Sequence, residues 1–168
     1  MQRDTTLEAW PEVVRAIIMA SAIHNIEGDV RLSEYDGAGA IVADRADDIA
    51  RRYHGNWGGY NYSCTTDTNL NIATMYLYAN QRTRVVISWD TDPAYTSYVS
   101  TSLPGADLDL FVVRSATGET VARSLSADNT YEIVDFIPPV TGYYTIRVTK
   151  FRCTSNPRYL GWAWHRGS

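Results

Sequence analysis

The fold is decided by the stretch Gly105-Ala106-Asp107-Leu108-Asp109-Leu110-Phe111-Val112-Val113. Acidic and apolar residues alternate in it, and a purely apolar run closes it. A period of two is typical of a β-strand and places Leu108 and Leu110 on one face, with Asp107 and Asp109 on the other. We expect the apolar face to pack against a second sheet. The acidic face is a suitable place for a cation.

Other short strands surround this one along the chain. The segment 70–78 alternates in the same way, and after a turn at 80–82 the apolar run 83–89 follows, which together predict a hairpin. Further strands are expected at 119–124, 131–136, 143–148 and 159–164, each bounded by turn residues. Seven to eight short strands with regular turn signals predict an antiparallel β-sandwich.

Two helices are expected in front of the strands. Pro11 suits the first position of a helix, where its missing N–H would have no partner. The run 13–22 that follows is apolar almost all round, which is typical of a helix buried in a larger body. A second helix is predicted over 43–52, with Ile49 on its apolar side. The first helix either covers one face of a sheet or pairs with another copy of the chain.

The composition excludes some classes of protein. The chain has 168 residues, of which 45% are hydrophobic, so it can build a packed core. Its formal net charge of −4 argues against a nucleic-acid-binding protein, because phosphate neutralisation needs a basic face. We find no stretch long enough to span a membrane, and no apolar export signal near Met1.

The two cysteines, Cys64 and Cys153, lie at opposite ends of the β-rich region and beside polar turn residues. In a secreted protein such a pair favours a disulfide that links the edges of a sandwich. The alternative is two unrelated buried thiols.

Four carboxylates are candidates for a calcium site: Asp90, Asp92, Asp107 and Asp109. They approach one another if the loop before Gly105 folds back, and carboxylates gathered with backbone carbonyls are the ligands that Ca²⁺ prefers. Alternatively they are solvated turn and strand residues, since their spacing does not match the EF-hand loop.

Aromatic residues are abundant, with 12 Tyr and 5 Trp. Trp162 and Trp164 share one face of a strand, and we expect both to fill the sandwich interior. Exposed aromatic rings stack on sugars and on peptide groups, so a cluster of them marks a binding surface. The candidates for such a surface are Trp57, Tyr60, Tyr62, Tyr95 and Tyr98.

The front segment resembles the tail of the catalytic domain of subtilisin-like serine proteases. The resemblance rests on Pro11, the apolar run 16–22 ending in Ser-Ala, the Gly-Ala-Gly turn at 37–39 and the Ala-rich helix around Ala46. The catalytic motifs of that family, Asp-Thr-Gly, His-Gly-Thr and Gly-Thr-Ser-x-Ala, do not occur in this sequence. A triad needs nucleophile, base and acid on one scaffold, so the resemblance implies a nucleophile upstream of Met1.

The rear segment is similar to the bacterial pre-peptidase C-terminal domain over about residues 69–165. Three blocks carry the similarity: 107–111 with Gly118 following, 139–148, and 159–160. The region is also similar to the P domain of kexin-like proteases, a jelly roll that follows a subtilisin-like catalytic domain. Both families imply a jelly-roll β-sandwich appended to a secreted protease, and some members bind Ca²⁺, collagen or other insoluble substrates.

Taken together, these resemblances divide the chain into three parts. Residues 1–52 are expected to be a helical tail of a catalytic domain, 53–68 a linker and first strand, and 69–168 the sandwich. The predicted function is that of a non-catalytic, extracellular accessory domain, with its export signal upstream of this fragment. It would stabilise the upstream protease domain or anchor a protein or polysaccharide substrate. The alternative is a free-standing β-sandwich module that binds carbohydrate or matrix protein.

Overall fold

The structure is a computed structural model that describes residues 7, 9–23, 37–51, 55–92, 103–127, 129–155 and 159–167. No helix in these ranges is long and apolar enough to cross a membrane. Within the described residues, two helices are followed by eight strands. The elements are α1 (Pro11–Ser21), α2 (Ala43–Ala50), β1 (Trp57–Tyr60), β2 (Asn69–Leu77), β3 (Thr83–Trp89), β4 (Ala106–Arg114), β5 (Thr120–Ser124), β6 (Tyr131–Phe136), β7 (Gly142–Cys153) and β8 (Leu160–Arg166).

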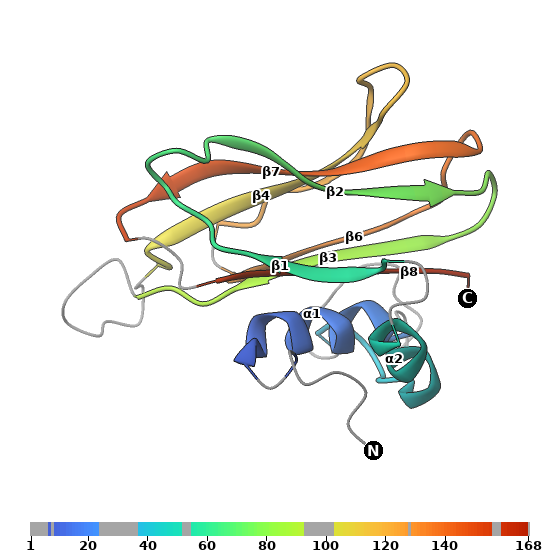
Figure 1. Cartoon of the computed structure of the whole chain (residues 1–168), viewed down its shortest axis with the longest axis horizontal. Coiled ribbons are helices and arrows are strands. Elements are labelled where there is room, and N and C mark those ends of the chain that lie inside the picture. Colours follow the sequence, from blue (N-terminus) through green and yellow to red (C-terminus); the bar gives the residue numbers. More distant parts are fainter. Residues whose placement is uncertain are drawn as a thin grey trace.

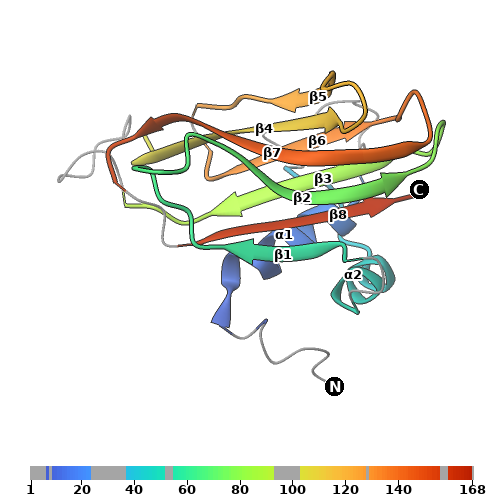
Figure 2. The same ribbon diagram turned by 45° about the horizontal axis from the view of Figure 1, so that its top comes forward.

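The strands form two four-stranded antiparallel sheets, ordered β1-β8-β3-β6 and β2-β7-β4-β5 (Figures 1 and 2). The pairings β4–β5, β3–β6, β2–β7 and β1–β8 are nested, as in one long hairpin that has been rolled up. Strands consecutive in the sequence therefore mostly alternate between the two sheets. This arrangement is the eight-stranded jelly roll. The prediction of an antiparallel jelly-roll sandwich preceded by two helices is confirmed.

The predicted hairpin between 70–78 and 83–89 is wrong. β2 pairs with β7 in one sheet, whereas β3 pairs with β6 and β8 in the other. All seven residues of β3 are buried, because the sandwich core covers one of its faces and the helices cover the other. A strand buried on both faces belongs in the middle of a covered sheet, which a two-stranded hairpin does not provide.

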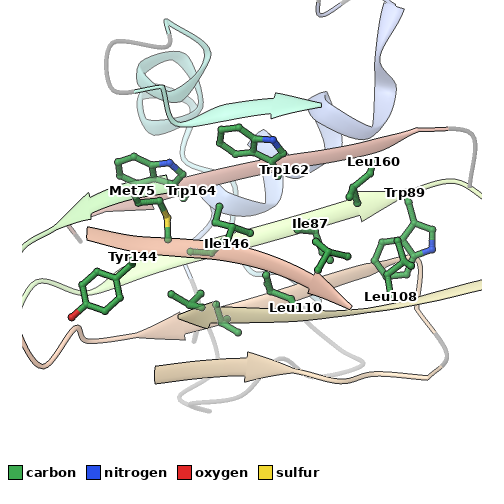
Figure 3. Packing of buried hydrophobic residues seen from close by; sticks show 14 of the residues in the cluster. Met75, Ile87, Trp89, Leu108, Leu110, Tyr144, Ile146, Leu160, Trp162 and Trp164 are labelled. Atoms are coloured by element: carbon green, nitrogen blue, oxygen red, sulfur yellow. The ribbon is translucent and has the colours of Figure 1, made fainter. Parts of the chain in front are cut away.

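The core lies between the sheets, and the fold-deciding stretch contributes to its centre. Leu108 and Leu110 of β4 are fully buried and point toward the opposite sheet, which contributes Ile87 and Trp89 to the core (Figure 3). Val112 of β4 is fully buried in the same cluster. The expectation that Leu108 and Leu110 point into a sandwich is confirmed. Full burial of a leucine side chain stabilises the folded state by about 1.5–3 kcal/mol.

A disulfide joins Cys64 to Cys153, with their Cα atoms 6.0 Å apart. Cys64 lies in the connection between β1 and β2, and Cys153 is the last residue of β7. The bond therefore fastens the crossing between the two sheets to the end of a central strand.

The helices form a third layer on the outer face of the β1-β8-β3-β6 sheet (Figure 1). Of the two arrangements left open for the first helix, the structure shows the cover over a sheet face. The buried apolar residues of α1 are Val13, Ala16, Ile17 and Ala20, and they pack in one cluster with Val86, Ile133 and Ala163 of the sheet. Gly161 lets the helix approach closely, since a Cβ there would fall 2.4 Å from the backbone nitrogen of Val13.

A buried arginine on β3 fastens the end of α1 to the sheet. The Nη1 atom of Arg84 donates to the carbonyls of Ala22 and Ala38 at 2.9 Å, and to the carbonyl of Met19 at 3.4 Å. On its other side the guanidinium pairs with Asp135 of β6, with Nη2 3.0 Å from Oδ2. A cation at a helix C-terminus is favourable because it satisfies carbonyls that have no partner within the helix.

Candidate binding surface

Two of the four carboxylates predicted to bind calcium lie together on β4. Asp107 is 1% exposed, and its Oδ2 lies 3.5 Å from Nη2 of Arg152. A register shift between β4 and β7 falls immediately after Asp107. Asp109 is only partly buried. Its pKa is raised, mainly because burial disfavours the charged form and also because the Asp107 carboxylate repels it. The acidic face of this strand is thus more enclosed than the sequence alone indicates.

The other two carboxylates lie at the exposed end of β3. Asp90 is exposed, with Oδ1 3.7 Å from Nη1 of Arg15, and Asp92 is exposed while its backbone carbonyl accepts from the N–H of Gly105. Within the described ranges, no three His, Cys, Asp or Glu side chains are grouped so that they could hold a metal ion. A calcium site formed by the four aspartates stays a prediction.

A third carboxylate near Asp107 and Asp109 was not anticipated from the sequence. Glu132 of β6 points between the sheets and is 1% exposed. Its Oε2 accepts from the hydroxyl of Ser124, and its Oε1 accepts from the backbone N–H of Ser126 at 2.7 Å. Since β5 and β6 are edge strands of opposite sheets, these bonds close one side of the sandwich.

Glu132 should make the stability of the protein depend on pH. Burial raises its pKa from 4.5 to about 7, and the charges of Asp109 and Asp107 add to the rise. Between these pH values the folded chain holds a proton that the unfolded chain has released. The Glu132 contribution to the free energy of unfolding should therefore fall by roughly 3 kcal/mol as pH increases from about 4.5 to about 7. Urea unfolding at pH 5, 6, 7 and 8 measures this change.

The matched pair of variants for this prediction is Glu132→Gln and Glu119→Gln. A glutamine at 132 stays neutral and keeps an acceptor for Ser126, so this variant should gain stability relative to the wild type as pH rises. Glu119 is exposed, and its replacement should leave the wild-type pH profile unchanged. A stability difference between Glu132→Gln and wild type that is constant from pH 5 to pH 8 would contradict the assignment.

Two of the aromatic residues predicted to form a binding surface lie inside the protein. Trp57 is 1% exposed, packs in the cluster beneath α1, and its Nε1 donates to the carbonyl of Ala50 at 3.3 Å. Tyr62 is 4% exposed and packs in the sandwich core. Burial of its hydroxyl, together with the nearby negative charge of Asp67, raises the pKa of Tyr62 to about 12. A surface role for these two rings is therefore wrong, because the helix layer and the core enclose them.

The remaining aromatic predictions have different outcomes. Tyr60 is 38% exposed at the end of β1. Tyr95 and Tyr98 lie outside the described residues. Trp162 and Trp164 are 9% and 2% exposed and belong to the core between the sheets, as expected (Figure 3).

The structure places a different group of aromatic rings on the surface. Tyr76 of β2, Tyr78 just after the end of β2, and Tyr143 of β7 are 41%, 47% and 62% exposed. The ring centroids of Tyr76 and Tyr143 are 5.0 Å apart at 71°, and those of Tyr76 and Tyr78 are 5.5 Å apart at 86°. Such edge-to-face contacts hold the rings in defined orientations. We call these three residues the tyrosine cluster.

Arg166, the last residue of β8, supports the tyrosine cluster. Its Nη1 donates to the carbonyl of Tyr76 at 2.9 Å, and its Cζ lies 5.0 Å from the ring centroid of Tyr78. A guanidinium at this distance from an aromatic ring makes a favourable cation–π contact. The cluster therefore combines exposed rings with a fixed geometry, which lowers the entropic cost of binding a ligand.

The sequence alone indicates only which of these tyrosines share a strand face. Tyr76 and Tyr78 fall on one face of an alternating strand, and Tyr143 stands beside Tyr144 at the start of another. The alternation does not tell which face points outward. The structure settles this, because Met75, Leu77 and Tyr144 occupy the core.

Comparisons with known proteins find remote structural similarity. No family model matches the sequence, and no curated protein matches it significantly. The chain is similar to the pre-peptidase C-terminal domain of a collagenase from Bacillus anthracis, at 10% identity over 65% of this chain and 85% of that one, with a TM-score of 0.44. It is also similar to PliG of Aeromonas hydrophila, a periplasmic inhibitor of g-type lysozyme, at 16% identity over 65% and 82%, with a TM-score of 0.35. At such values function has to be argued from the surface itself.

Proposed function

We propose that this chain is a non-catalytic accessory module of a secreted subtilisin-like protease, and that it anchors the enzyme to an extended polymeric substrate. The observation that carries the proposal is the tyrosine cluster, three exposed and mutually oriented rings on the sheet that α1 and α2 do not cover. Aromatic rings of this kind offer large contact area at low conformational cost. The absence of triad motifs from the sequence supports a role other than bond cleavage.

The helix layer supports a rigid attachment to the protease body. The residues that resemble the end of a catalytic domain are those that pack on the β1-β8-β3-β6 sheet. Arg15 of α1 also binds the sheet. Its Nη1 donates to the hydroxyl of Thr130 at 2.9 Å, and its Cζ lies 5.2 Å from the ring centroid of Tyr131. A catalytic domain preceding these helices would thus be held in one orientation, with the tyrosine cluster on the far face of the module.

The same contacts favour the second candidate, a free-standing binding module. The apolar face of α1 is covered by the chain's own sheet, so this helix does not require another domain to bury it. Sequencing the coding region upstream of Met1 separates the two. A reading frame with the three triad motifs supports the accessory module, and its absence supports the free-standing one.

The anchoring role predicts polymer binding that depends on the tyrosine cluster. The full chain should be retained by at least one insoluble polymer from a panel of cellulose, chitin, polyuronate gel and fibrillar collagen. Replacing Tyr76 and Tyr143 together with alanine should weaken that retention at least tenfold, or about 1.4 kcal/mol. Depletion assays with increasing polymer measure the affinity.

Tyr60→Ala is the matched control, since it removes an exposed tyrosine from the opposite sheet. It should leave retention unchanged. Equal retention of the wild type and the Tyr76→Ala/Tyr143→Ala variant would refute anchoring through the cluster. Hydrolysis of casein by the purified chain would refute the non-catalytic role.

A further inference from the structure

A row of polar and aromatic side chains crosses the β2-β7-β4-β5 sheet. The pairing register aligns Asn71 of β2 with Arg147 of β7, Arg147 with Phe111 of β4, and Phe111 with Arg123 of β5. The row lies four residues along β7 from Tyr143, or about 13 Å from the tyrosine cluster. We call these four residues the arginine row.

The arginine row faces away from the core. On β4, the neighbours of Phe111 are Leu110 and Val112, and both are fully buried between the sheets. On β7, the neighbours of Arg147 are Ile146 and Val148, which are also fully buried. Because successive side chains of a strand point to opposite faces, Phe111 and Arg147 lie on the outer face. Tyr76 and Tyr143 are on this same face.

A positively charged side chain, an aromatic ring and a second positively charged side chain follow one another along the row, each on the next strand of the sheet. Arg147 and Arg123 lie on either side of Phe111, so their Cα atoms are separated by two strand spacings, or about 10 Å. Arg123 is exposed. The Nε atom of Arg147 donates to Oδ1 of Asn71 at 3.0 Å, which orients the guanidinium and uses one of its five N–H donors.

This arrangement fits an anionic partner although the whole chain has a net charge of −4. A planar guanidinium binds a carboxylate or a sulfate through two parallel hydrogen bonds. The hydroxyl-bearing side chains of Thr74 and Thr145 lie between the arginine row and the tyrosine cluster, paired across β2 and β7. The face thus presents two cations, aromatic rings and hydroxyl groups, together with one carboxylate, that of the partly buried Asp109 two residues along β4 from Phe111. The two guanidinium groups outnumber this carboxylate, and the rings offer surfaces on which sugars pack.

We propose that the outer face of the β2-β7-β4-β5 sheet binds an acidic polysaccharide. Arg147 and Arg123 pair with two anionic groups that lie about 10 Å apart along the polysaccharide. The rings of Phe111, Tyr76 and Tyr143 contact the apolar faces of the sugars. This inference rests on the proposed anchoring function and adds the chemical class of the polymer.

Isothermal titration of the full chain with three soluble polymers tests the inference. The probes are oligogalacturonate, which carries carboxylates, dextran sulfate, which carries sulfates, and neutral cello-oligosaccharide. We expect at least one anionic probe to bind tenfold or more tightly than the neutral one, with affinity falling as salt increases. The preferred probe identifies whether carboxylate or sulfate is the anionic group.

The variant Arg147→Gln/Arg123→Gln should lose this preference and bind the anionic probe at least tenfold more weakly. Arg82→Gln is the matched control, because Arg82 is an exposed arginine beside the opposite sheet, and it should behave as the wild type. Thermal melting verifies that both variants are folded.

The outcomes separate the inference from the proposed function. Equal binding of neutral and anionic probes that still depends on Tyr76 and Tyr143 would overturn the acidic class and leave anchoring intact. Anionic binding that survives loss of both arginines would overturn the role of the arginine row. No binding of any polymer, soluble or insoluble, would overturn both proposals.

Discussion

Replacing Arg84 with alanine is expected to lower the free energy of unfolding by about 3–5 kcal/mol, because it leaves the partners of a buried cation uncompensated. Arg84 is 5% exposed, and its guanidinium bridges Asp135 to the carbonyls of Ala22 and Ala38. Without it, a carboxylate with only 17% of its side chain exposed loses its buried partner, and the end of α1 loses its attachment to the sheet. Urea unfolding followed by tryptophan fluorescence gives the loss.

Arg82→Ala is the control for this experiment. Arg82 pairs with the other oxygen of the same carboxylate at 3.1 Å, but 53% of its side chain is exposed. Exposed pairs contribute about 0–1 kcal/mol, so this variant should be close to wild type. If the two substitutions cost the same, Arg84 does not fasten the helix layer in the way the structure indicates.

The second large effect is expected at the fold-deciding strand. Leu110 is fully buried between the sheets, so Leu110→Ala should cost about 2–5 kcal/mol through lost burial and the cavity that remains. Leu125→Ala removes the same atoms from a residue that is 50% exposed, and it should change stability by about 0.5 kcal/mol or less. Chemical denaturation of both variants compares them. A small loss at Leu110 would mean that β4 does not lie at the centre of the core.

Local periodicity was sufficient to predict the strands and the sandwich. The alternation around Leu108 and Leu110 identifies both the strand and its buried face, and Pro11 marks the start of α1. The partners of each strand were not predictable in this way. β2 and β3 follow one another after a short turn, yet they pair with β7 and with β6 and β8, because a jelly roll joins strands that are far apart in sequence. Which strands pair depends on the whole fold, so the pattern within ten consecutive residues does not predict the partners of a strand.

The candidate surface was harder to predict for a related reason. Exposure of an aromatic ring depends on what packs over it, and the sequence does not show that α1 and α2 cover Trp57 while leaving Tyr76 and Tyr143 exposed. Glu132 is a similar case. Its raised pKa comes from enclosure between two edge strands and from Asp109 and Asp107, which are more than twenty positions away in sequence.

We expect the module to hold its polymer on the outer face of the β2-β7-β4-β5 sheet. Backbone-amide chemical shifts, recorded while a soluble fragment of the retained polymer is titrated into the full chain, test it directly. We expect the largest shift changes on β2, β7, β4 and β5, with the amides of Tyr76 and Tyr143 among them. If the largest shift changes fall on α1, α2 and β1 and the tyrosine cluster is unaffected, the polymer does not bind the β2-β7-β4-β5 face.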